Sequence, residues 1–286
     1  MHAMARQIRL ATLVAAALSA GACCAAALAA GSGRVSASSG SVVATITYSH
    51  HPKSVVAPYS DLRLTIVRAG KTLVTGPVTS GLCDTGCWPI VPGALRVLDV
   101  EADGEPDVLL NLYSGGAHCC NVTEVFRYDA HSPSYHKVTH IWGDPAYTLE
   151  RLNGSRPYEW LTQDDRFAYA FAAYAFSGLP LEVLRLRDGV FSDVTASYPL
   201  LVTKDAAEQW KDYKSNESGG VGGGLGYLAA WAADEYTLGR SDFVTTTLAQ
   251  LLSSGGLRST SGFPWVGGTK FVTQLERFLR KTGYAH

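Results

Sequence analysis

Alternation of apolar and polar residues dominates the chain from about residue 41 to residue 200. Residues 42–48 (VVATITY) and 62–67 (LRLTIV) alternate as strands with one buried face do. Similar short segments, rich in β-branched residues, recur at 73–78, 95–98, 108–113, 122–128, 135–142, 167–173, 181–187 and 190–194. We therefore predict a β-rich domain over residues 41–200.

The apolar period changes to that of helices in residues 201–286. Residues 205–208 (DAAE) form a capping box that opens a first helix, and the glycine run 219–224 separates it from a second helix at about 225–238. A third helix begins at a Ser241 cap, and a fourth carries the apolar stripe Phe271, Leu275, Phe278 and Leu279 and ends at Gly283. Such stripes bury against one another or against a sheet. The predicted fold class is α+β, with a helical C-terminal region.

The first 29 residues have the layout of a secretory signal peptide. Arg6 and Arg9 precede an uncharged run rich in Ala, Leu and Val, which ends in the small triplet Ala27-Leu28-Ala29. A retained membrane anchor is one alternative, because the run is long enough to span a bilayer. A lipoprotein signal is another, because two cysteines lie inside the segment. The small-residue ending favours cleavage, and we predict a signal peptide over residues 1–29.

The balance of charged residues indicates which classes of binding partner are unsuitable. The chain has 24 Lys and Arg residues against 25 Asp and Glu residues, and two of the arginines belong to the leader. This balance provides no basic surface for nucleic acid or for an anionic membrane. After the leader, no apolar run is long enough to span a membrane. Residues 30–40 are rich in Gly and Ser, which predicts a flexible linker. We expect a secreted or extracytoplasmic protein.

Oxygen-bearing side chains recur at every second position of residues 99–107 (DVEADGEPD). Calcium requires six to eight oxygen ligands, so a loop coiled round the ion points alternate side chains inward. Gly104, at the sixth position, permits the sharp bend. The predicted metal ligands are Asp99, Glu101, Asp103, Asp107 and, through its carbonyl, Glu105. The alternative is a solvated acidic turn without metal, in which the carboxylates would repel one another.

Strand-like segments flank this loop, whereas an EF-hand would have helices there and a Glu at the twelfth position, which is Leu110. The loop resembles the calcium loop of FG-GAP or VCBS repeats, D-x-[DN]-x-D-G-x-x-D between two strands, with Glu101 as the one departure. Together with its GGAHCC and DDRFAYAF motifs, the chain resembles exported repeat proteins of high-GC bacteria. Residues 153–159 (NGSRPYE) resemble a second copy without the leading carboxylates, and we assign them no metal.

The resemblance implies sheets like the blades of a β-propeller, and it implies no established activity. At about 40 to 50 residues per blade, the β-rich domain has room for three or four blades. A closed propeller needs at least about four. We therefore expect a partial or small propeller-like assembly of sheets.

Four cysteines follow the leader, at Cys83, Cys87, Cys119 and Cys120. In an oxidising compartment this even count predicts two disulfides. Neighbouring Cα atoms lie about 3.8 Å apart, less than the roughly 4.4 to 6.8 Å that disulfides prefer, so we favour bridges between the two pairs. Pairing of Cys119 with Cys120, and of Cys83 with Cys87, is the alternative. A zinc site that adds His118 is a further alternative, which export disfavours.

Two classes of function fit these features. The first is a non-catalytic binding or structural module, stabilised by Ca²⁺, that presents loops to an extracellular protein or polysaccharide. The second is a secreted hydrolase of cell-wall or polysaccharide material, with acids from Glu159, Asp164 or Asp165. Adjacent carboxylates usually point apart, and we expect Asp165 to pair with Arg166. Since the sequence also lacks a nucleophile elbow and a phosphate-binding loop, we favour the binding module.

Overall fold

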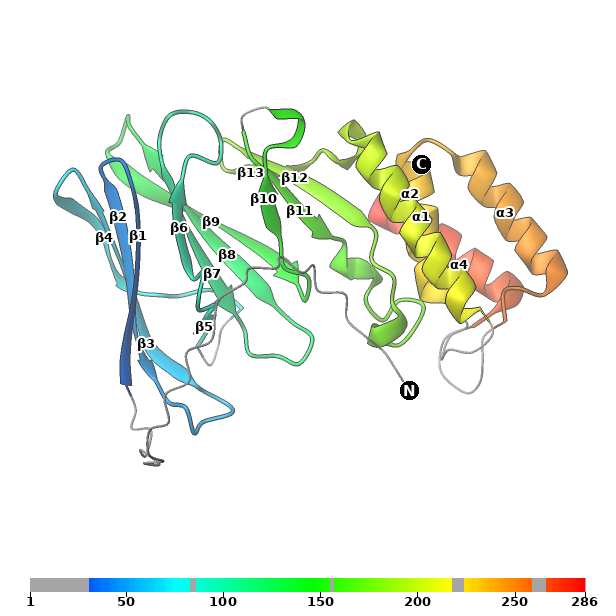
Figure 1. Ribbon diagram of the computed structural model, residues 1–286, viewed down its shortest axis with the longest axis horizontal. Coiled ribbons are helices and arrows are strands. Elements are labelled where there is room, and N and C mark those ends of the chain that lie inside the picture. The colour runs from blue at the N-terminus through cyan, green and yellow to red at the C-terminus, as the bar shows by residue number, and fades with distance from the viewer. Residues whose placement is uncertain (1–30, 83–85, 155–156, 218–223, 259–265, 286) are drawn as a thin grey trace, which may run out of the picture.

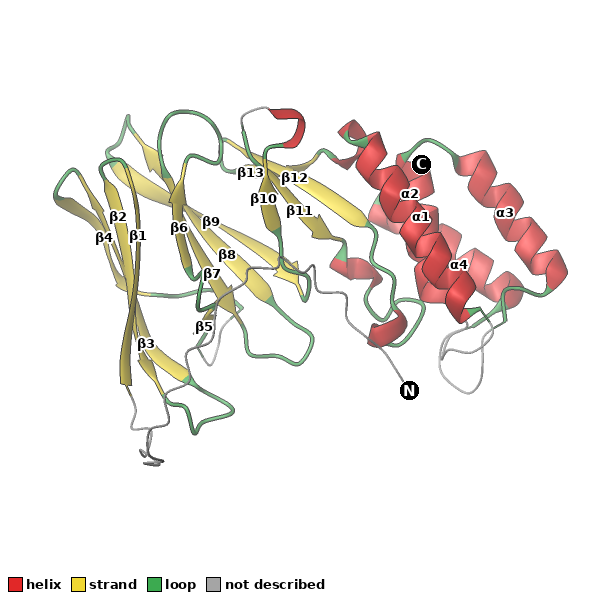
Figure 2. Ribbon diagram, in the orientation of Figure 1, coloured by secondary structure: helices red, strands yellow, loops and turns green. Residues whose placement is uncertain are grey.

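Sheets make up one end of the molecule and helices the other (Figure 1, Figure 2). The computed structural model describes residues 31–82, 86–154, 157–217, 224–258 and 266–285. Within these residues three antiparallel sheets follow one another along the chain. The predicted signal peptide lies outside the described residues.

The first sheet is a meander in chain order. It consists of β1 (Gly31–Ser39), β2 (Val42–His50), β3 (Tyr59–Arg68) and β4 (Lys71–Pro77). Its first strand takes the place of the flexible linker predicted for residues 30–40, so that prediction is wrong for residues 31–39. A tight turn at Gly40, with φ of 55°, folds this segment back onto β2. Val35 packs against the core, so pairing and burial outweigh the Gly and Ser content.

The second and third sheets repeat the antiparallel pattern. The second consists of β5 (Trp88–Pro89), β6 (Leu95–Leu98), β7 (Asp107–Tyr113), β8 (Asn121–Asp129) and β9 (Ser134–Gly143), with β5 and β6 both paired to β7. The third consists of β10 (Thr148–Glu150), β11 (Glu159–Gln163), β12 (Leu181–Arg187) and β13 (Val190–Asp193). All three sheets are open, and they do not close into a propeller.

The second sheet is buried on both faces. Leu110 and Leu112 of β7 belong to a core shared with the first sheet, where Ile66 packs. Leu109, on the opposite face of β7, belongs to a core shared with the third sheet, where Trp160 packs. Successive side chains of a strand point to opposite faces, so a nearly continuous apolar strand suits this central position.

Four helices follow the sheets in the described residues. They are α1 (Pro199–Asn216), α2 (Leu225–Thr237), α3 (Ser241–Ser254) and α4 (Gly268–Thr282). The α+β class is confirmed, as is the end of the last helix at Gly283, which has a φ of 90°. The first helix begins at Pro199, six residues before the predicted capping box, because proline is well suited to a first turn.

The strand predicted at residues 167–173 is absent from the structure. Short 3-10 turns occupy Asp165–Phe167 and Tyr174–Phe176 in its neighbourhood. The side chain of Asp164 accepts a hydrogen bond from the Arg166 backbone N–H, which starts the first turn. Phe167 and Phe171 then enter the core of the helical region. The apolar residues of this segment are therefore buried by tertiary packing rather than by strand pairing.

Candidate functional site

The acidic loop connects β6 to β7, whose paired ends bring Leu98 opposite Asp107. Inside the loop, the Asp99 carboxylate accepts hydrogen bonds from the backbone N–H groups of Asp103 (3.1 Å) and Gly104 (3.0 Å). The Asp103 carboxylate accepts one from the backbone N–H of Glu105 (2.9 Å). Gly104 has a φ of 92°, as the predicted sharp bend requires. The aspartates thus hold the backbone of the loop in a compact turn.

Asp107 is the most buried acidic residue of the loop, with 2% of its surface exposed. Its Oδ2 accepts a hydrogen bond from the Val100 backbone N–H at 3.1 Å. Burial raises the pKa of Asp107 to about 8, and the nearby carboxylates of Glu101 and Asp103 add to this rise. The site therefore disfavours a bare negative charge at Asp107 and favours a bound cation or proton.

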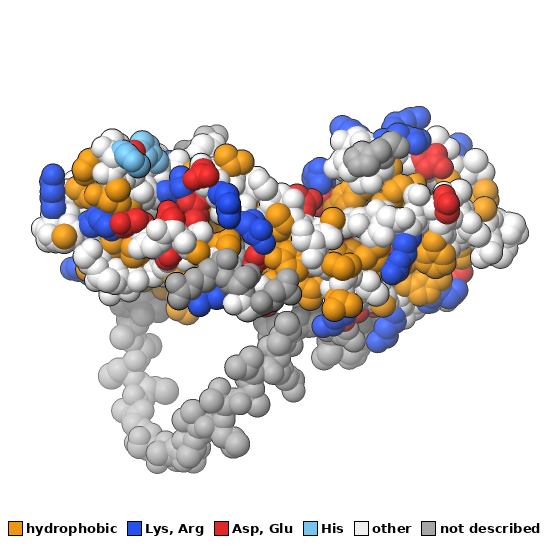
Figure 3. Space-filling view, turned by 90° about the horizontal axis from the view of Figure 1, so that it is seen from above, with side chains coloured by type: hydrophobic (Ala, Val, Ile, Leu, Met, Phe, Trp, Pro, Cys, Tyr) orange, Lys and Arg blue, Asp and Glu red, His pale blue; other side chains and the backbone are white. Residues whose placement is uncertain are grey.

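The two glutamates of the loop are turned toward arginines. Glu101 forms an ion pair with Arg127 of β8, and Arg127 Nε donates to its Oε2 at 2.7 Å. Glu105 forms an ion pair with Arg68 at the end of β3. Acidic and basic side chains accordingly interleave over the sheet half of the face in Figure 3. Neither arginine was predicted from the sequence, because both lie in strands that also carry other polar and charged residues.

The five predicted ligands fall into two groups, according to whether their side chains form ion pairs. The side chains of Glu101 and Glu105 form ion pairs with arginines. Asp99, Asp103 and Asp107 form no ion pair with a described residue, although the charge of Arg127 acts on Asp107 from nearby. No group of three or more His, Cys, Asp or Glu side chains among the described residues is placed to hold a metal ion. A carboxylate has about four lone-pair sites, so each aspartate retains acceptor capacity beyond its hydrogen bonds. Carboxylate oxygens are the ligand type that a hard cation prefers, although these three side chains are not gathered around one point.

The third sheet contains a natural comparison for Asp107. Glu159 begins β11 as Asp107 begins β7, and it is completely buried. Its Oε1 lies 2.6 Å from the Arg185 guanidinium on β12 and accepts a hydrogen bond from the Tyr198 hydroxyl at 2.8 Å. Arg185 thus neutralises the buried carboxylate of Glu159.

A polar hollow of about 250 Å³ lies beside the loop. Asp99 lines it on the loop side, and Arg151 and Tyr158 line it on the side of the third sheet. The Arg151 guanidinium lies over the Tyr158 ring, 4.5 Å from the centroid. The hollow therefore offers an anionic group, a cationic group and an aromatic ring to a ligand at the surface.

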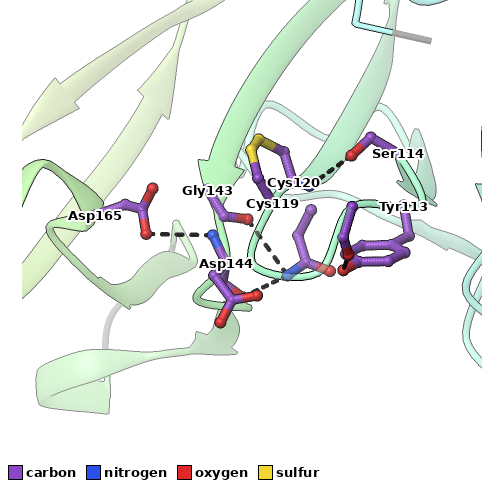
Figure 4. Close-up of a disulfide and its surroundings, with 9 residues drawn as sticks. Tyr113, Ser114, Cys119, Cys120, Gly143, Asp144 and Asp165 are labelled. Atoms are coloured by element: carbon purple, nitrogen blue, oxygen red, sulfur yellow. Dashed lines mark hydrogen bonds between the residues drawn. A yellow bond between two sulfur atoms is a disulfide. The ribbon is translucent and has the colours of Figure 1, made fainter. Parts of the chain in front are cut away.

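The disulfide arrangement differs from the one favoured by the sequence. Cys119 and Cys120 are bonded to each other at the start of β8 (Figure 4), and Cys87 is also disulfide-bonded. Bridges from Cys87 to either of the adjacent cysteines are therefore excluded, and Cys83 lies outside the described residues. The Cα–Cα distance that disulfides usually prefer predicted the wrong pairing, because the two cysteines bonded here are neighbours in the chain. The zinc alternative is wrong for these three cysteines, because their sulfurs are not free thiolates.

The carboxylates considered for a hydrolase are held by other protein groups. Asp164 is buried and makes a two-point contact with Arg166, at 2.8 Å and 2.6 Å, and accepts a hydrogen bond from the Tyr284 hydroxyl. Asp165 instead accepts a hydrogen bond from the Asp144 backbone N–H (Figure 4). The expected pair between Asp165 and Arg166 is therefore wrong, because Arg166 turns to the neighbouring carboxylate. These acids anchor the chain where the third sheet meets the helices.

Comparisons with known proteins add little to the geometry. No family model matches the chain. It is 30% identical over 164 residues to a probable thylakoid lumen protein of Synechocystis sp., a match that covers 54% of this chain and 46% of that protein. It is 26% identical over 189 residues to an uncharacterized protein of Sinorhizobium fredii, covering 65% of this chain and 29% of that one. The chain thus spans less than half the length of these relatives.

Among solved structures, a Xanthomonas type IV secretion system related protein matches 57% of this chain and 93% of its own, with 15% identity and a TM-score of 0.26. This score is too low to support an argument. Within the described residues, none of the helices has the length and apolar character needed to cross a membrane.

Proposed function

We propose that the protein is an extracytoplasmic binding module without catalytic activity, stabilised by a calcium ion in the loop between β6 and β7. The observation that carries the proposal is the buried Asp107 carboxylate, which has no ion-pair partner among the described residues. A buried charge is costly unless a partner neutralises it. The equivalent carboxylate in the third sheet, Glu159, has its arginine. A calcium ion would supply the missing positive charge in the second sheet.

Asp99, Asp103 and Asp107 are the side chains that would hold this ion, together with the predicted carbonyl of Glu105. Their oxygens are the ligand type that calcium prefers. When bound, the ion supplies two positive charges to a loop that is otherwise dominated by carboxylates. Glu105 and Glu101, through their ion pairs with arginines, then hold the loop against β3 and β8.

Two observations support a location outside the cytoplasm. Cys87, Cys119 and Cys120 are disulfide-bonded, which is typical of oxidising compartments. The relative from Synechocystis is described as a protein of the thylakoid lumen, which is also outside the cytoplasm. We further propose that each open sheet is a blade-like unit related to FG-GAP or VCBS repeats. The ligand would be a protein or polysaccharide that reaches the polar hollow lined by Asp99 and Arg151.

Thermal unfolding in chelator and in millimolar calcium tests the metal site. Binding to the folded state alone adds about 2.7 kcal/mol at a hundredfold excess of calcium over Kd. In a chain of this size the melting temperature should rise by roughly 5 to 10 °C. Magnesium should have less effect, because it keeps its waters and requires a tighter octahedron. Asp107→Asn and Asp103→Ala should each abolish the calcium-dependent rise.

The matched control is Asp212→Asn, which changes an exposed carboxylate on α1 and should leave the rise intact. Equal melting temperatures of the unchanged protein in the two buffers, with no calcium in elemental analysis, would refute the metal site. Turnover of glycosides, esters or peptides that disappears in Asp164→Asn or Asp165→Asn would contradict the absence of catalysis.

A further inference from the structure

A cavity of about 200 Å³ lies between the first and second sheets, away from the acidic loop. Its walls are mostly apolar, and they come from β3, β4 and the segment after β4 on one side and from β7, β8 and β9 on the other. The lining side chains include Val74, Val78, Leu110, Glu124 and Lys137. An engineered apolar cavity of about 150 Å³ suffices to bind benzene, so this one has room for a six-membered ring.

Gly76 lines this space and has no side chain to fill it. It lies on the lining face of β4 between Val74 and Val78, which both pack against the core. A Cβ atom added at Gly76 would meet no atom within 4 Å, and the backbone there is not in the left-handed region. A larger residue could therefore occupy the position, and its absence leaves a hollow opposite Glu124.

Glu124 is one of the residues that line this hollow, and one of its carboxylate oxygens lacks a described partner. Only 1% of its surface is exposed. Its Oε2 accepts a hydrogen bond from the Thr139 hydroxyl at 2.6 Å and lies 3.4 Å from Lys137 Nζ. Its Oε1 is buried and has no hydrogen-bond partner among the described residues. A buried acceptor without a partner is unfavourable, so a donor placed in the cavity would gain from meeting it.

The charges around the cavity restrict the ligand. Lys137 pairs with Glu124 and donates to the backbone carbonyl of Thr79 at 2.9 Å, so the site is neutral before a ligand enters. A cationic ligand would meet the ammonium of Lys137 without a new counter-charge. An anionic ligand would meet the carboxylate of Glu124. A neutral donor satisfies Glu124 Oε1 and adds no net charge to a partly buried site.

We propose that this cavity binds a small neutral organic molecule that has an apolar ring or branched body and a hydroxyl or primary amide group. The hydroxyl or amide donates to Glu124 Oε1, and the body packs between Val74, Val78 and Leu110. This site is separate from the calcium loop. The same binding is therefore expected in calcium and in chelator, which keeps its failure distinct from a failure of the metal proposal.

Methyl NMR of the full chain with three probes of one shape tests the proposal. Cyclohexanol should shift the methyl signals of Val74, Val78 and Leu110 in a saturable manner. Cyclohexylammonium and cyclohexanecarboxylate should bind at least about tenfold more weakly, because each adds an unmatched charge. Equal binding of the three probes, or no saturable shift with cyclohexanol at these methyl groups, would overturn the proposal.

Two variants locate the binding site. Gly76→Val fills the cavity and should abolish the cyclohexanol shifts, whereas Gly31→Val should preserve them, because Gly31 is a strand glycine with equally open surroundings on β1. Glu124→Gln keeps the shape but leaves Lys137 unmatched, so the preference should move toward cyclohexanecarboxylate. Unchanged cyclohexanol binding in Gly76→Val, or an unchanged probe order in Glu124→Gln, would also overturn the proposal.

Discussion

Asp107 and Glu159 begin β7 and β11 in successive sheets, and only Glu159 is ion-paired to an arginine, Arg185. Arg127 of the second sheet pairs with Glu101 instead. The third sheet therefore pairs its buried carboxylate with an arginine, whereas the second sheet does not. Substitutions at the two carboxylates should therefore respond differently to calcium.

Glu159→Gln should destabilise the protein in calcium and in chelator alike. The substitution leaves Arg185 with no carboxylate, and breaking a buried pair costs about 3 to 5 kcal/mol. The lower end is expected, because Arg185 retains some contact with water. Urea unfolding measures the loss, and Glu150→Gln, at an exposed position of β10, should change stability by less than about 0.5 kcal/mol. If the loss of stability in Glu159→Gln depended on calcium, the buried carboxylates of the two sheets would not be neutralised in different ways.

Acid should weaken the protein through His140. Its ring packs against Trp142 and Phe191, with centroid separations of 4.0 Å and 4.4 Å, and burial lowers its pKa to about 4. The unfolded chain binds this proton near pH 6.5, before the folded one does. The stability due to neutral His140 is therefore complete above about pH 6.5 and is lost as the pH falls toward 4, by an amount on the order of 2 kcal/mol.

Denaturant unfolding between pH 7.5 and pH 4 measures this effect. His140→Gln should flatten the part of the stability curve that His140 causes, since the amide does not titrate. His131→Gln changes an exposed histidine and should leave the curve unchanged. Identical curves for the original protein and His140→Gln would show that the buried ring does not control this slope.

Peptide mapping without reduction should find Cys119 and Cys120 in one peptide whose mass is lower by two hydrogen atoms. Cys120→Ser should then expose Cys119 to alkylation, because its only bonding partner has been removed. Cys87 should remain protected in this variant, since its own bond is separate. A crosslinked peptide that joins Cys87 to Cys119 or Cys120 would restore the arrangement that the sequence favoured.

Leu275→Ala should cost about 2 to 5 kcal/mol of unfolding free energy, because this leucine of α4 is completely buried in the helical core. Leu252→Ala on α3 is the matched control, since that leucine is 38% exposed. Its cost should stay below about 1 kcal/mol. Thermal or urea unfolding compares the two variants, and equal losses would contradict the assigned burial.

Local patterns in the sequence determined much of this fold. Short segments rich in apolar and β-branched residues predicted β2, β7, β8 and β12, and helical periodicity predicted α4, because both signals depend on near neighbours in the chain. The same is true of the turn at the acidic loop. Side-chain periodicity could not reveal β1, whose Gly and Ser residues are held by pairing with β2.

Only the tertiary structure decided which charged side chains pair with one another. Glu101 meets Arg127, 26 residues away, and Arg185 reaches Glu159 from a neighbouring strand. Such pairs depend on strand register and sheet packing, which spacing along the chain does not encode. The cavity at Gly76 has the same origin, since a glycine in a strand becomes a hollow only when a second sheet packs against it. The sequence determined which side chains were present, and packing determined which of them were left without a partner.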